Sequence, residues 1–430
     1  MKVKVIGAGL AGVEAAYYLA NRGVKVQLYD IKPNAFTPAH KSTDFAELVC
    51  SNSLKSSDIY GNAAGLLKEE MRLLGSITME AAEIAKVPAG GALAVNREEF
   101  SRYITDKIRS HPDIECVSEE IKKVPQDGYA LIATGPLTTS KLADDIRKSA
   151  GALYFYDASA PIIAADSIDM EHAFVGDRYN KGDGDHINCP MTKDEYIAFY
   201  DALISAERAT LHEFEKTEVF EGCMPVEIMA ARGKDTLRFG PLKPVGLDDP
   251  KTGRWAYATL QLRREDKTGT MYNMVGFQTN LKFSEQKRVF SMIPALKNAE
   301  FLRYGVMHRN TFINSPEALE PDYSFKFRPS LFIAGQITGV EGYVESAGSG
   351  LLAAIYLERK LCGKPQILIS ENTVLGALSK YITTPNKNFQ PMNANFGILP
   401  PIDVRDKKDK KRLAAERSLA AVKQFITEIS

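Results

Sequence analysis

A glycine pattern near the start of the chain constrains its fold more than any other feature. Residues 7–12, Gly-Ala-Gly-Leu-Ala-Gly, form a GxGxxG motif directly after the apolar run at residues 3–6. A helix-like segment follows at residues 13–20, and residues 24–30 then alternate like a strand and end in an acid. This order of strand, glycine turn, helix and strand predicts a βαβ unit and therefore a parallel sheet.

The residues of this motif have the properties of a dinucleotide site. Gly7 allows a tight turn, Gly9 lets the backbone approach a pyrophosphate, and Gly12 permits close packing of helix on strand. The N-terminus of the helix that follows offers free N–H groups to the phosphates, and we expect Ala8, Leu10 and Ala11 of the motif to take part in binding the cofactor. Asp30, at the end of the second strand, can accept hydrogen bonds from ribose hydroxyls. An ordinary glycine turn is the alternative.

Two later apolar runs also end at glycine, and they bear on the kind of nucleotide. Residues 129–135 end at Gly135 and residues 331–335 end at Gly335, as buried parallel strands do at a ligand-binding edge. A simple dehydrogenase keeps its glycine fingerprint in one half of the chain, so this recurrence favours FAD. The helix after Gly335 would direct its positive end at the flavin and stabilise the reduced ring. A loop that only caps a core helix is the alternative.

The region between the last two of these strands has a different character. It is rich in Pro, Gly and aromatic residues, it has a capping box at Thr192 and Glu195, and residues 257–262 resemble a strand. We expect residues 165–315 to form an inserted mixed α+β domain. Residues 1–165 and 315–430 would form one discontinuous α/β domain with the Rossmann-like, glutathione-reductase-like fold that binds FAD. Residues 413–429 have helical apolar spacing and are expected to cap its sheet.

Cysteine usage and charge limit the classes of function. Five scattered cysteines without CxxC pairs argue against a disulfide framework or a structural zinc site, and we expect no metal. The formal net charge is zero, so only local basic runs, at residues 405–412 and within 232–267, could indicate RNA contact rather than a solvated face. Without a signal-peptide pattern or an apolar span, the expected location is the cytoplasm.

Two cysteines have informative neighbours. Cys50 lies in a polar segment, and the nearby Lys55 would favour its thiolate. Cys223 lies between Gly222 and Pro225, which bend the chain and leave the sulfur at the end of an element. For each of them, an inert core thiol is the alternative.

Longer strings of the sequence lead to a family resemblance. They are residues 37–40 (TPAH), 46–53 (AELVCSNS), 87–95 (VPAGGALAV), 237–241 (LRFGP) and 308–314 (HRNTFIN). With them the chain closely resembles, nearly end to end, the bacterial folate- and FAD-dependent tRNA (uracil-5-)-methyltransferases, the TrmFO family. Asn96 stands where the resemblance leads us to expect an Asp before Arg97, and Asp30 where we expect a Glu. The second exchange keeps an acid for the ribose.

The resemblance implies methylation of C5 of the T-loop uridine in the T-arm of tRNA. Cys50 or Cys223 would add to uracil C6 as a thiolate, which makes C5 nucleophilic, and the other would assist by removing the C5 proton. 5,10-Methylenetetrahydrofolate would supply the carbon and reduced FAD the hydride, with NADPH or NADH reducing the flavin. Tyr343 would stack on the isoalloxazine. The inserted domain would hold the RNA, with the target base extruded from its loop.

Several alternatives stay open at this point. The same chemistry could act on a uridine of 23S ribosomal RNA. The larger GidA-type proteins share the expected fold but add a long helical C-terminal domain, for which this chain has no room. A non-catalytic flavin-binding RNA chaperone and an NADPH oxidase-like flavoenzyme are further possibilities. The two thiols at the family's positions favour the methyltransferase over both.

Overall fold

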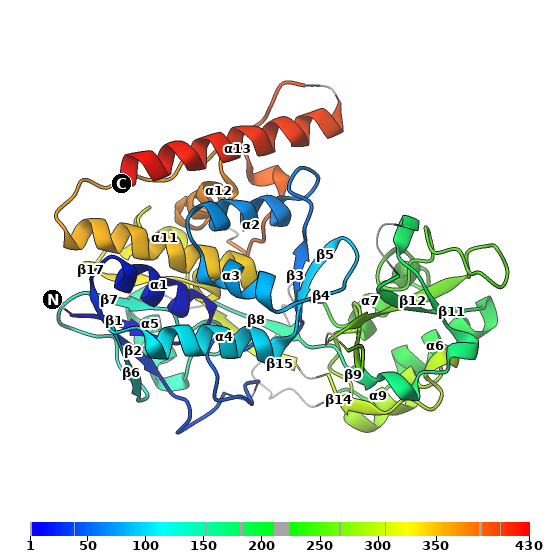
Figure 1. Ribbon diagram of the computed structural model, residues 1–430. Coiled ribbons are helices and arrows are strands. Elements are labelled where there is room, and N and C mark those ends of the chain that lie inside the picture. Colours follow the sequence, from blue (N-terminus) through cyan, green and yellow to red (C-terminus); the bar gives the residue numbers. More distant parts are fainter. Residues whose placement is uncertain are drawn as a thin grey trace.

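The protein contains two large sheets that lie side by side (Figure 1). The computed structural model describes residues 2–37, 39–150, 153–180, 184–209, 224–265, 268–305, 307–386, 389–404 and 406–430. Strands of the first sheet come from both ends of this chain, and strands of the second come from residues 162–303. No helix within the described ranges is long and apolar enough to cross a membrane.

The first sheet has the order β16-β17-β7-β1-β2-β6 and is parallel except for the edge strand β16. Its strands are β1 (Lys2–Ile6), β2 (Lys25–Asp30), β6 (Ile114–Ser118), β7 (Ala130–Ile132), β16 (Ser324–Phe325) and β17 (Arg328–Ile333). The strands predicted at residues 3–6, 24–30, 129–135 and 331–335 are thereby confirmed, with shorter bounds for β7. We call this sheet the parallel sheet.

Helices cover both faces of the parallel sheet. On one face, Val5 and Leu131 share a core with α1 (Leu10–Asn21) and α11 (Tyr343–Leu361). On the other face, Ile132 and Ile333 pack with α5 (Ser140–Ala150). This two-sided burial explains why these strands are apolar at almost every position. Helices α1 and α11 can pack closely because Gly350 has no side chain. A Cβ at this position would lie 2.2 Å from the Ala11 carbonyl oxygen.

The second sheet is antiparallel, with the order β10-β11-β12-β13-β9-β14. Its strands are β9 (Ile162–Ala164), β10 (Phe174–Val175), β11 (His186–Met191), β12 (Ala258–Arg264), β13 (Met271–Met274) and β14 (Phe301–Arg303). Leu260 and Leu262 face a core shared with α6 (Lys193–Ser205) and α9 (Phe283–Phe290). The capping box predicted at the start of α6 is confirmed, because the Thr192 backbone N–H donates to Glu195 Oε2 at 2.7 Å.

The other face of this antiparallel sheet is polar. Alternate residues of a strand point to opposite faces, so Gln261 and Arg263 project away from that core. Arg263 pairs in register with Asn273 of β13, and Asn273 pairs with Ile162 of β9. Arg263 and Asn273 are nevertheless buried, with exposed fractions of 8 % and 3 %. A buried polar face indicates that it meets another part of the protein.

Smaller elements connect and cover the two sheets. They are β3 (Ser53–Ser56), β4 (Lys86–Val87) and β5 (Ala92–Val95), the pair β8 (Leu153–Ala158) and β15 (Met307–Phe312), and helices α2 (Ala63–Leu73), α3 (Ile77–Ile84), α4 (Arg97–Ser110), α7 (Val226–Ala231), α8 (Thr236–Phe239), α10 (Ser315–Ala318), α12 (Val374–Thr383) and α13 (Lys407–Ile429). The antiparallel β8–β15 pair lies where the chain passes from one large sheet to the other and back. Since β9 precedes residue 165 but belongs to the antiparallel sheet, the domain boundaries at 165 and 315 stay a prediction.

The C-terminal helix does not take its predicted place. Residues 413–429 are helical, as expected, within α13. The helix lies outside the layer of α2, α12 and α11 and packs on α2 instead of covering the sheet (Figure 1). The prediction that it caps the sheet is wrong, because α11 already buries that face.

Candidate active site

Three of the predicted glycines follow strands that end at one edge of the parallel sheet. Ile6 of β1 pairs in register with Ile132 of β7, and Ile132 pairs with Ile333 of β17. Gly7 directly follows the first of these strands, and Gly135 and Gly335 follow the other two. All three glycines have positive φ, so the chain turns sharply where each strand ends. The carboxyl edge of a parallel sheet is the ordinary place for a ligand.

The GxGxxG turn has the geometry that a dinucleotide needs. A Cβ on Gly7 would lie 2.5 Å from the Ala133 carbonyl oxygen, and one on Gly12 would lie 1.8 Å from the Gly7 carbonyl oxygen. A Cβ on Gly9, in contrast, would meet nothing within 4 Å. Helix α1 begins at Leu10 and has no side-chain cap at its N-terminus. Its first N–H groups, from Leu10 and Ala11 onward, therefore have no side-chain cap at the positive end of the helix.

A cleft of about 680 Å³, including its open mouth, lies against this turn. It is lined by Gly7, Ala8 and Gly9, and by Asp30 from the end of β2. The Asp30 carboxylate accepts hydrogen bonds from the backbone N–H of Ala8 at 2.8 Å and of Lys32 at 2.9 Å. A carboxylate has about four acceptor positions, so Asp30 keeps capacity for a ribose. The cleft, the open space at Gly9 and the uncapped helix together fit the adenosine and pyrophosphate of a dinucleotide.

The loop after β17 continues the edge toward a second helix end. A Cβ on Gly335 would lie 3.1 Å from the Ala11 Cβ, so this loop packs directly on α1. Helix α11 begins at Tyr343 after Gly342, which has a φ of +120° and offers no side-chain cap. The carboxylate of Glu345 in its first turn forms an ion pair of 2.6 Å with Lys55. The positive end of α11 thus lies near the Cys50 segment.

Cys50 and Tyr343 are in direct contact. The Tyr343 hydroxyl oxygen accepts hydrogen bonds from the backbone N–H of Cys50 at 2.7 Å and of Ser51 at 3.3 Å, and it lies 2.9 Å from Cys50 Sγ. A phenol oxygen can accept about two hydrogen bonds and donate one. Because two amides occupy the acceptor positions, the Tyr343 proton is left to point at the sulfur.

This proton stays on the tyrosine over the physiological range. Burial raises the pKa of Tyr343 well above its usual value, and the neighbouring Cys50 raises it further. The hydroxyl is therefore a donor to Cys50 Sγ, and a donated hydrogen bond stabilises negative charge on a sulfur. The arrangement favours the thiolate form of Cys50, the form that acts as a nucleophile.

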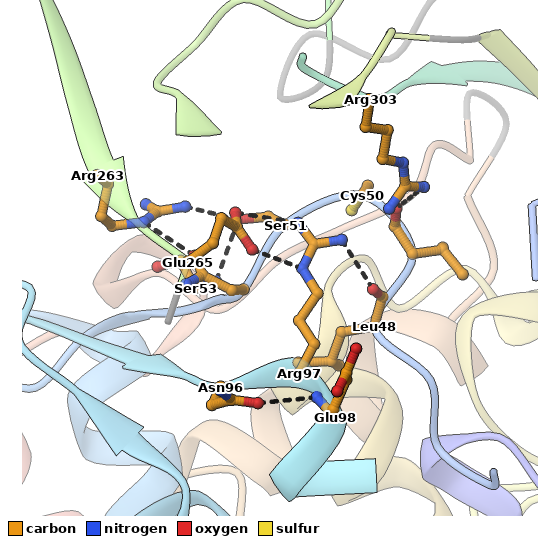
Figure 2. Close-up of polar contacts among 12 residues, drawn as sticks. Leu48, Cys50, Ser51, Ser53, Asn96, Arg97, Glu98, Arg263, Glu265 and Arg303 are labelled. Carbon is orange, nitrogen blue, oxygen red and sulfur yellow. Dashed lines mark hydrogen bonds and ion pairs between the residues drawn. The ribbon is translucent and has the colours of Figure 1, made fainter. Parts of the chain in front are cut away.

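Three arginines hold the chain on either side of Cys50, two through backbone carbonyls and one through side chains (Figure 2). Arg303 donates to the Val49 carbonyl oxygen at 2.5 Å, and Arg97 donates to that of Leu48 at 3.1 Å. Arg263 donates to Ser51 Oγ at 2.8 Å, and also to Asn52 Oδ1 at 3.1 Å. We call Arg97, Arg263 and Arg303 the arginine clamp. Its last two members come from the polar face of the antiparallel sheet, so this face meets the parallel part of the protein at the Cys50 segment.

The Glu265 carboxylate fixes the first member of the clamp. It lies 2.8 Å from Arg97 Nε, and Arg97 Nη2 donates to its other oxygen at 3.1 Å. Burial disfavours the charge of Arg97, but Glu265 outweighs this and raises the pKa of Arg97, with smaller contributions from Tyr343 and Cys50. Burial lowers the pKa of Arg263 and of Arg303. The site therefore contains concentrated positive charge with one buried counter-charge.

The structure brings some predicted residues together and leaves others apart. Gly7, Gly135, Gly335 and Asp30 lie at or near one sheet edge, whereas Cys50 and Tyr343 meet further along it. The contact of Tyr343 with Cys50 was not predicted, and its stacking on a flavin stays a prediction. Cys223 lies outside the described residues, and so does most of the segment around it. Where the structure describes the chain, no group of three or more His, Cys, Asp or Glu residues could hold a metal ion.

The arginine clamp was missed by sequence reasoning. Arg263 lies within the basic run at residues 232–267 that would indicate RNA contact, and the structure corrects this, since its guanidinium is buried against Ser51 and Asn52. The one sequence signal for the clamp was the position of Arg97, directly after Asn96, because the family resemblance predicts an Asp–Arg pair at these two positions. Asn96 caps α4 by accepting from the N–H groups of Glu98 and Glu99, both at 3.1 Å. An Asp would serve the same cap, so the exchange leaves Arg97 in place.

Comparison with known proteins identifies the family. The family model described as GIDA, glucose inhibited division protein A, matches residues 2–365. A methylenetetrahydrofolate–tRNA-(uracil-5-)-methyltransferase TrmFO from Listeria monocytogenes is 57 % identical, over 99 % of both chains. The TrmFO of Halalkalibacterium halodurans is 55 % identical over 99 % of both chains, and that of Acetivibrio thermocellus is 54 % identical over 100 % of this chain and 99 % of its own. The chain belongs to the TrmFO family of methylenetetrahydrofolate–tRNA-(uracil-5-)-methyltransferases.

Solved structures give the same fold. The two crystal forms of Aquifex aeolicus GidA match with TM-scores of 0.70 and 0.69. The matches cover 98 % and 99 % of this chain, and 73 % and 78 % of the GidA chains, at 16 % and 17 % sequence identity. At that identity the likeness concerns the fold alone. The predicted fold class, a Rossmann-like flavoprotein fold with a mixed α+β insertion, is confirmed.

Proposed function

We propose that this TrmFO-family protein methylates C5 of the T-loop uridine of tRNA. The relatives' names support the reaction class, and the observation that carries the site is the Cys50 Sγ held 2.9 Å from a protonated Tyr343 hydroxyl within the arginine clamp. Uracil C5 is a poor nucleophile, so the reaction needs a thiolate that first adds to C6. The site supplies a thiol in surroundings that stabilise its anion.

The residues at the sheet edge fit the FAD that this chemistry needs. The groups proposed to hold it are Gly7, Ala8, Gly9, Leu10, Ala11, Gly12, Asp30, Gly135, Gly335 and Tyr343. The fit rests on the open space at Gly9, the uncapped N-terminus of α1 and the free acceptor positions of Asp30. Bound FAD would supply hydride transfer, with 5,10-methylenetetrahydrofolate as the carbon source and NADPH or NADH as the source of electrons.

The protein's own groups account for the covalent steps at the base. A thiolate sulfur forms a bond to C6, and the electron pair of the C5–C6 double bond moves toward C5 and the C4 oxygen. Guanidinium groups close to Cys50 stabilise the negative charge that develops on the base. After the carbon is attached, a base removes the C5 proton, and the sulfur–C6 bond breaks to restore the ring. Cys50 and Cys223 are proposed for the nucleophile and the base, in an order that the experiment below decides.

The proposal also concerns location and the RNA. The enzyme would work in the bacterial cytoplasm, where its substrate is, and residues 165–315 would hold the T-arm. The target uridine is extruded from its loop before reaction, because a thiol cannot reach C6 of a stacked base. An RNA of this kind would approach the clamp from the side where the two sheets meet.

A methyl-transfer assay on unmodified tRNA tests the function. Protein, methylenetetrahydrofolate and NADPH or NADH should convert the T-loop uridine to its 5-methyl form, measured by mass spectrometry of RNA digests. A 23S ribosomal RNA fragment in the same assay tests the alternative target. Nicotinamide oxidation without RNA methylation would instead indicate an oxidase. RNA binding without any turnover would indicate a chaperone.

A covalent trap assigns the thiols. RNA with 5-fluorouracil at the target position keeps the sulfur–C6 bond, since fluorine cannot leave as a proton. The adduct should form in only one of Cys50→Ala and Cys223→Ala, and the variant that fails identifies the nucleophile. Cys362→Ala is the matched control, because this exposed cysteine directly follows the C-terminus of α11, at the opposite end of the helix from Tyr343. An adduct in both single variants would show that neither Cys50 nor Cys223 is the required nucleophile and would overturn their proposed roles.

A further inference from the structure

Three aromatic rings form a parallel stack at the edge of the antiparallel sheet. Tyr304 lies in the middle, 4.9 Å from the Phe283 ring at an interplanar angle of 14° and 5.4 Å from the Phe301 ring at 6°. Phe301 packs against the core that α6 and α9 share. Phe283 is 54 % exposed. The Phe283 ring is therefore supported by Tyr304 on its inner face, and a large part of the residue stays exposed.

The stack lies close to the Cys50 segment. Phe301 and Arg303 belong to β14, an edge strand, and Tyr304 follows it directly. Arg303 is the clamp residue that donates to the Val49 carbonyl oxygen. Figure 1 shows β14 and α9 next to each other on the side of the antiparallel sheet near β9. A strand of nucleotides that leaves a base at Cys50 can reach this stack within a few residues, because an extended nucleotide spans several ångströms.

The segment that carries all three rings is positively charged. Residues 281–304 contain five cations, Lys282, Lys287, Arg288, Lys297 and Arg303, against two acids, Glu285 and Glu300. Exposed ion pairs join Lys282 to Glu207 and Arg288 to Glu285. Lys287 has no ion pair among the residues that the structure describes. Phosphates are the partners that such a surface attracts.

We propose that the outer face of Phe283 is a stacking platform for an unpaired base of the RNA substrate, a few nucleotides from the target uridine. This rests on the proposed function. Unpaired bases in RNA loops are commonly held on exposed aromatic faces, and a supported ring between cations suits a base and its phosphates. A protein partner would more often cover a larger and less charged apolar patch.

Variants of Phe283 test the platform through RNA affinity. Phe283→Ala should weaken binding of a T-arm hairpin by about 10- to 100-fold, the range that one stacked base represents. Phe283→Leu keeps an apolar side chain but should also lose most of the affinity for the hairpin. Phe283→Trp, which keeps an aromatic ring, should retain the affinity of the unmodified protein. The turnover number at saturating RNA should change little, because Phe283 does not touch the reacting base.

Phe327→Ala is the matched control. Phe327 is 51 % exposed and also contacts a second ring, Phe325 at 4.9 Å, but it lies in the turn between β16 and β17 of the parallel sheet. A hairpin with 2-aminopurine at single loop positions should show quenched fluorescence on binding at one position, and Phe283→Ala should remove this quenching. The Phe327 variant should keep it.

The outcomes separate this inference from the proposed function. If the unmodified protein neither binds nor methylates the T-arm, the proposed function fails before any variant is measured. If the unmodified protein methylates it and Phe283→Ala binds RNA as tightly, the platform alone is wrong. A Phe283→Ala protein with unchanged RNA affinity but an altered oligomeric state in sedimentation would show instead that the ring contacts protein.

Discussion

The ion pair between Arg97 and Glu265 should carry much of the contact between the two sheets. Arg97 is the first residue of α4 in the parallel part, and Glu265 directly follows β12 in the antiparallel part. Their side chains are exposed by only 15 % and 2 %, and two nitrogen–oxygen contacts join them at 2.8 and 3.1 Å. Replacement of Glu265 by Gln keeps the size of the side chain and removes its charge.

The expected loss follows from the geometry. Two unit charges about 4 Å apart attract by about 4 kcal/mol at the effective dielectric constant of a partly buried site. A Gln retains one neutral hydrogen bond to the guanidinium, which contributes about 1 kcal/mol. Glu265→Gln should therefore lower the free energy of unfolding by about 3 kcal/mol, in the range for breaking a buried pair.

A double-mutant cycle with Arg97→Met measures this loss by urea denaturation of the FAD-loaded protein. The Glu265→Gln change should cost about 3 kcal/mol in the unmodified protein and less than about 1 kcal/mol in the Arg97→Met protein. Glu285→Gln is the control, because its pair with Arg288 is exposed and should contribute less than about 1 kcal/mol. Equal losses for Glu265→Gln and Glu285→Gln would refute the reasoning.

Three further outcomes are expected. Gly9→Ala should leave the stability of the apoprotein unchanged, but the purified protein should lack flavin absorbance. Gly12→Ala should lack flavin absorbance and also unfold at a lower temperature, because a Cβ on Gly12 would lie 1.8 Å from a backbone oxygen, whereas one on Gly9 meets nothing within 4 Å. Tyr343→Phe removes the donor to Cys50 Sγ and should slow iodoacetamide alkylation of Cys50 at neutral pH about 10-fold, measured by peptide mass spectrometry, an effect of about one hydrogen bond. Burial raises the pKa of Glu70 from 4.5 to about 7, against opposing hydrogen bonds from Ser418, Leu375 and Val374. The native protein then keeps a proton that the unfolded chain releases, so stability should fall by about 3 kcal/mol as the pH rises from 4.5 to 7, and pH-dependent denaturation of Glu70→Gln should lack this fall.

The nucleotide edge could be predicted because local rules determine it. An apolar strand followed by Gly7, Gly9 and Gly12 can form few other structures, since each glycine meets a distinct steric demand that is visible in a short window of sequence. The same holds for the capping box at Thr192, which needs only Glu195 three residues later. These features depend on neighbours along the chain and not on the tertiary fold.

The arginine clamp could not be predicted, because its members are brought together only by the fold. More than a hundred residues separate Arg97 from Arg263, and Arg303 lies on a different strand from Arg263. In the sequence, each of the three resembles an ordinary surface cation. The burial of the polar face of the antiparallel sheet could not be predicted from the sequence either. Its alternating pattern is the one expected of a solvent-exposed face, and only the position of the Cys50 segment shows that the face is buried.

The clamp makes the position of the Cys50 segment depend on both parts of the protein. Tyr343, on a helix of the parallel part, holds Cys50 from one side through its hydroxyl. Arg263 and Arg303, on the antiparallel sheet, hold Ser51 and Val49 on either side of the same residue. A shift of one sheet relative to the other would therefore move the residues that flank Cys50 and change the distance of its sulfur from the Tyr343 hydroxyl. If RNA binds to the antiparallel part as we propose, it would thereby alter the reactivity of Cys50, which is held from the parallel part by Tyr343.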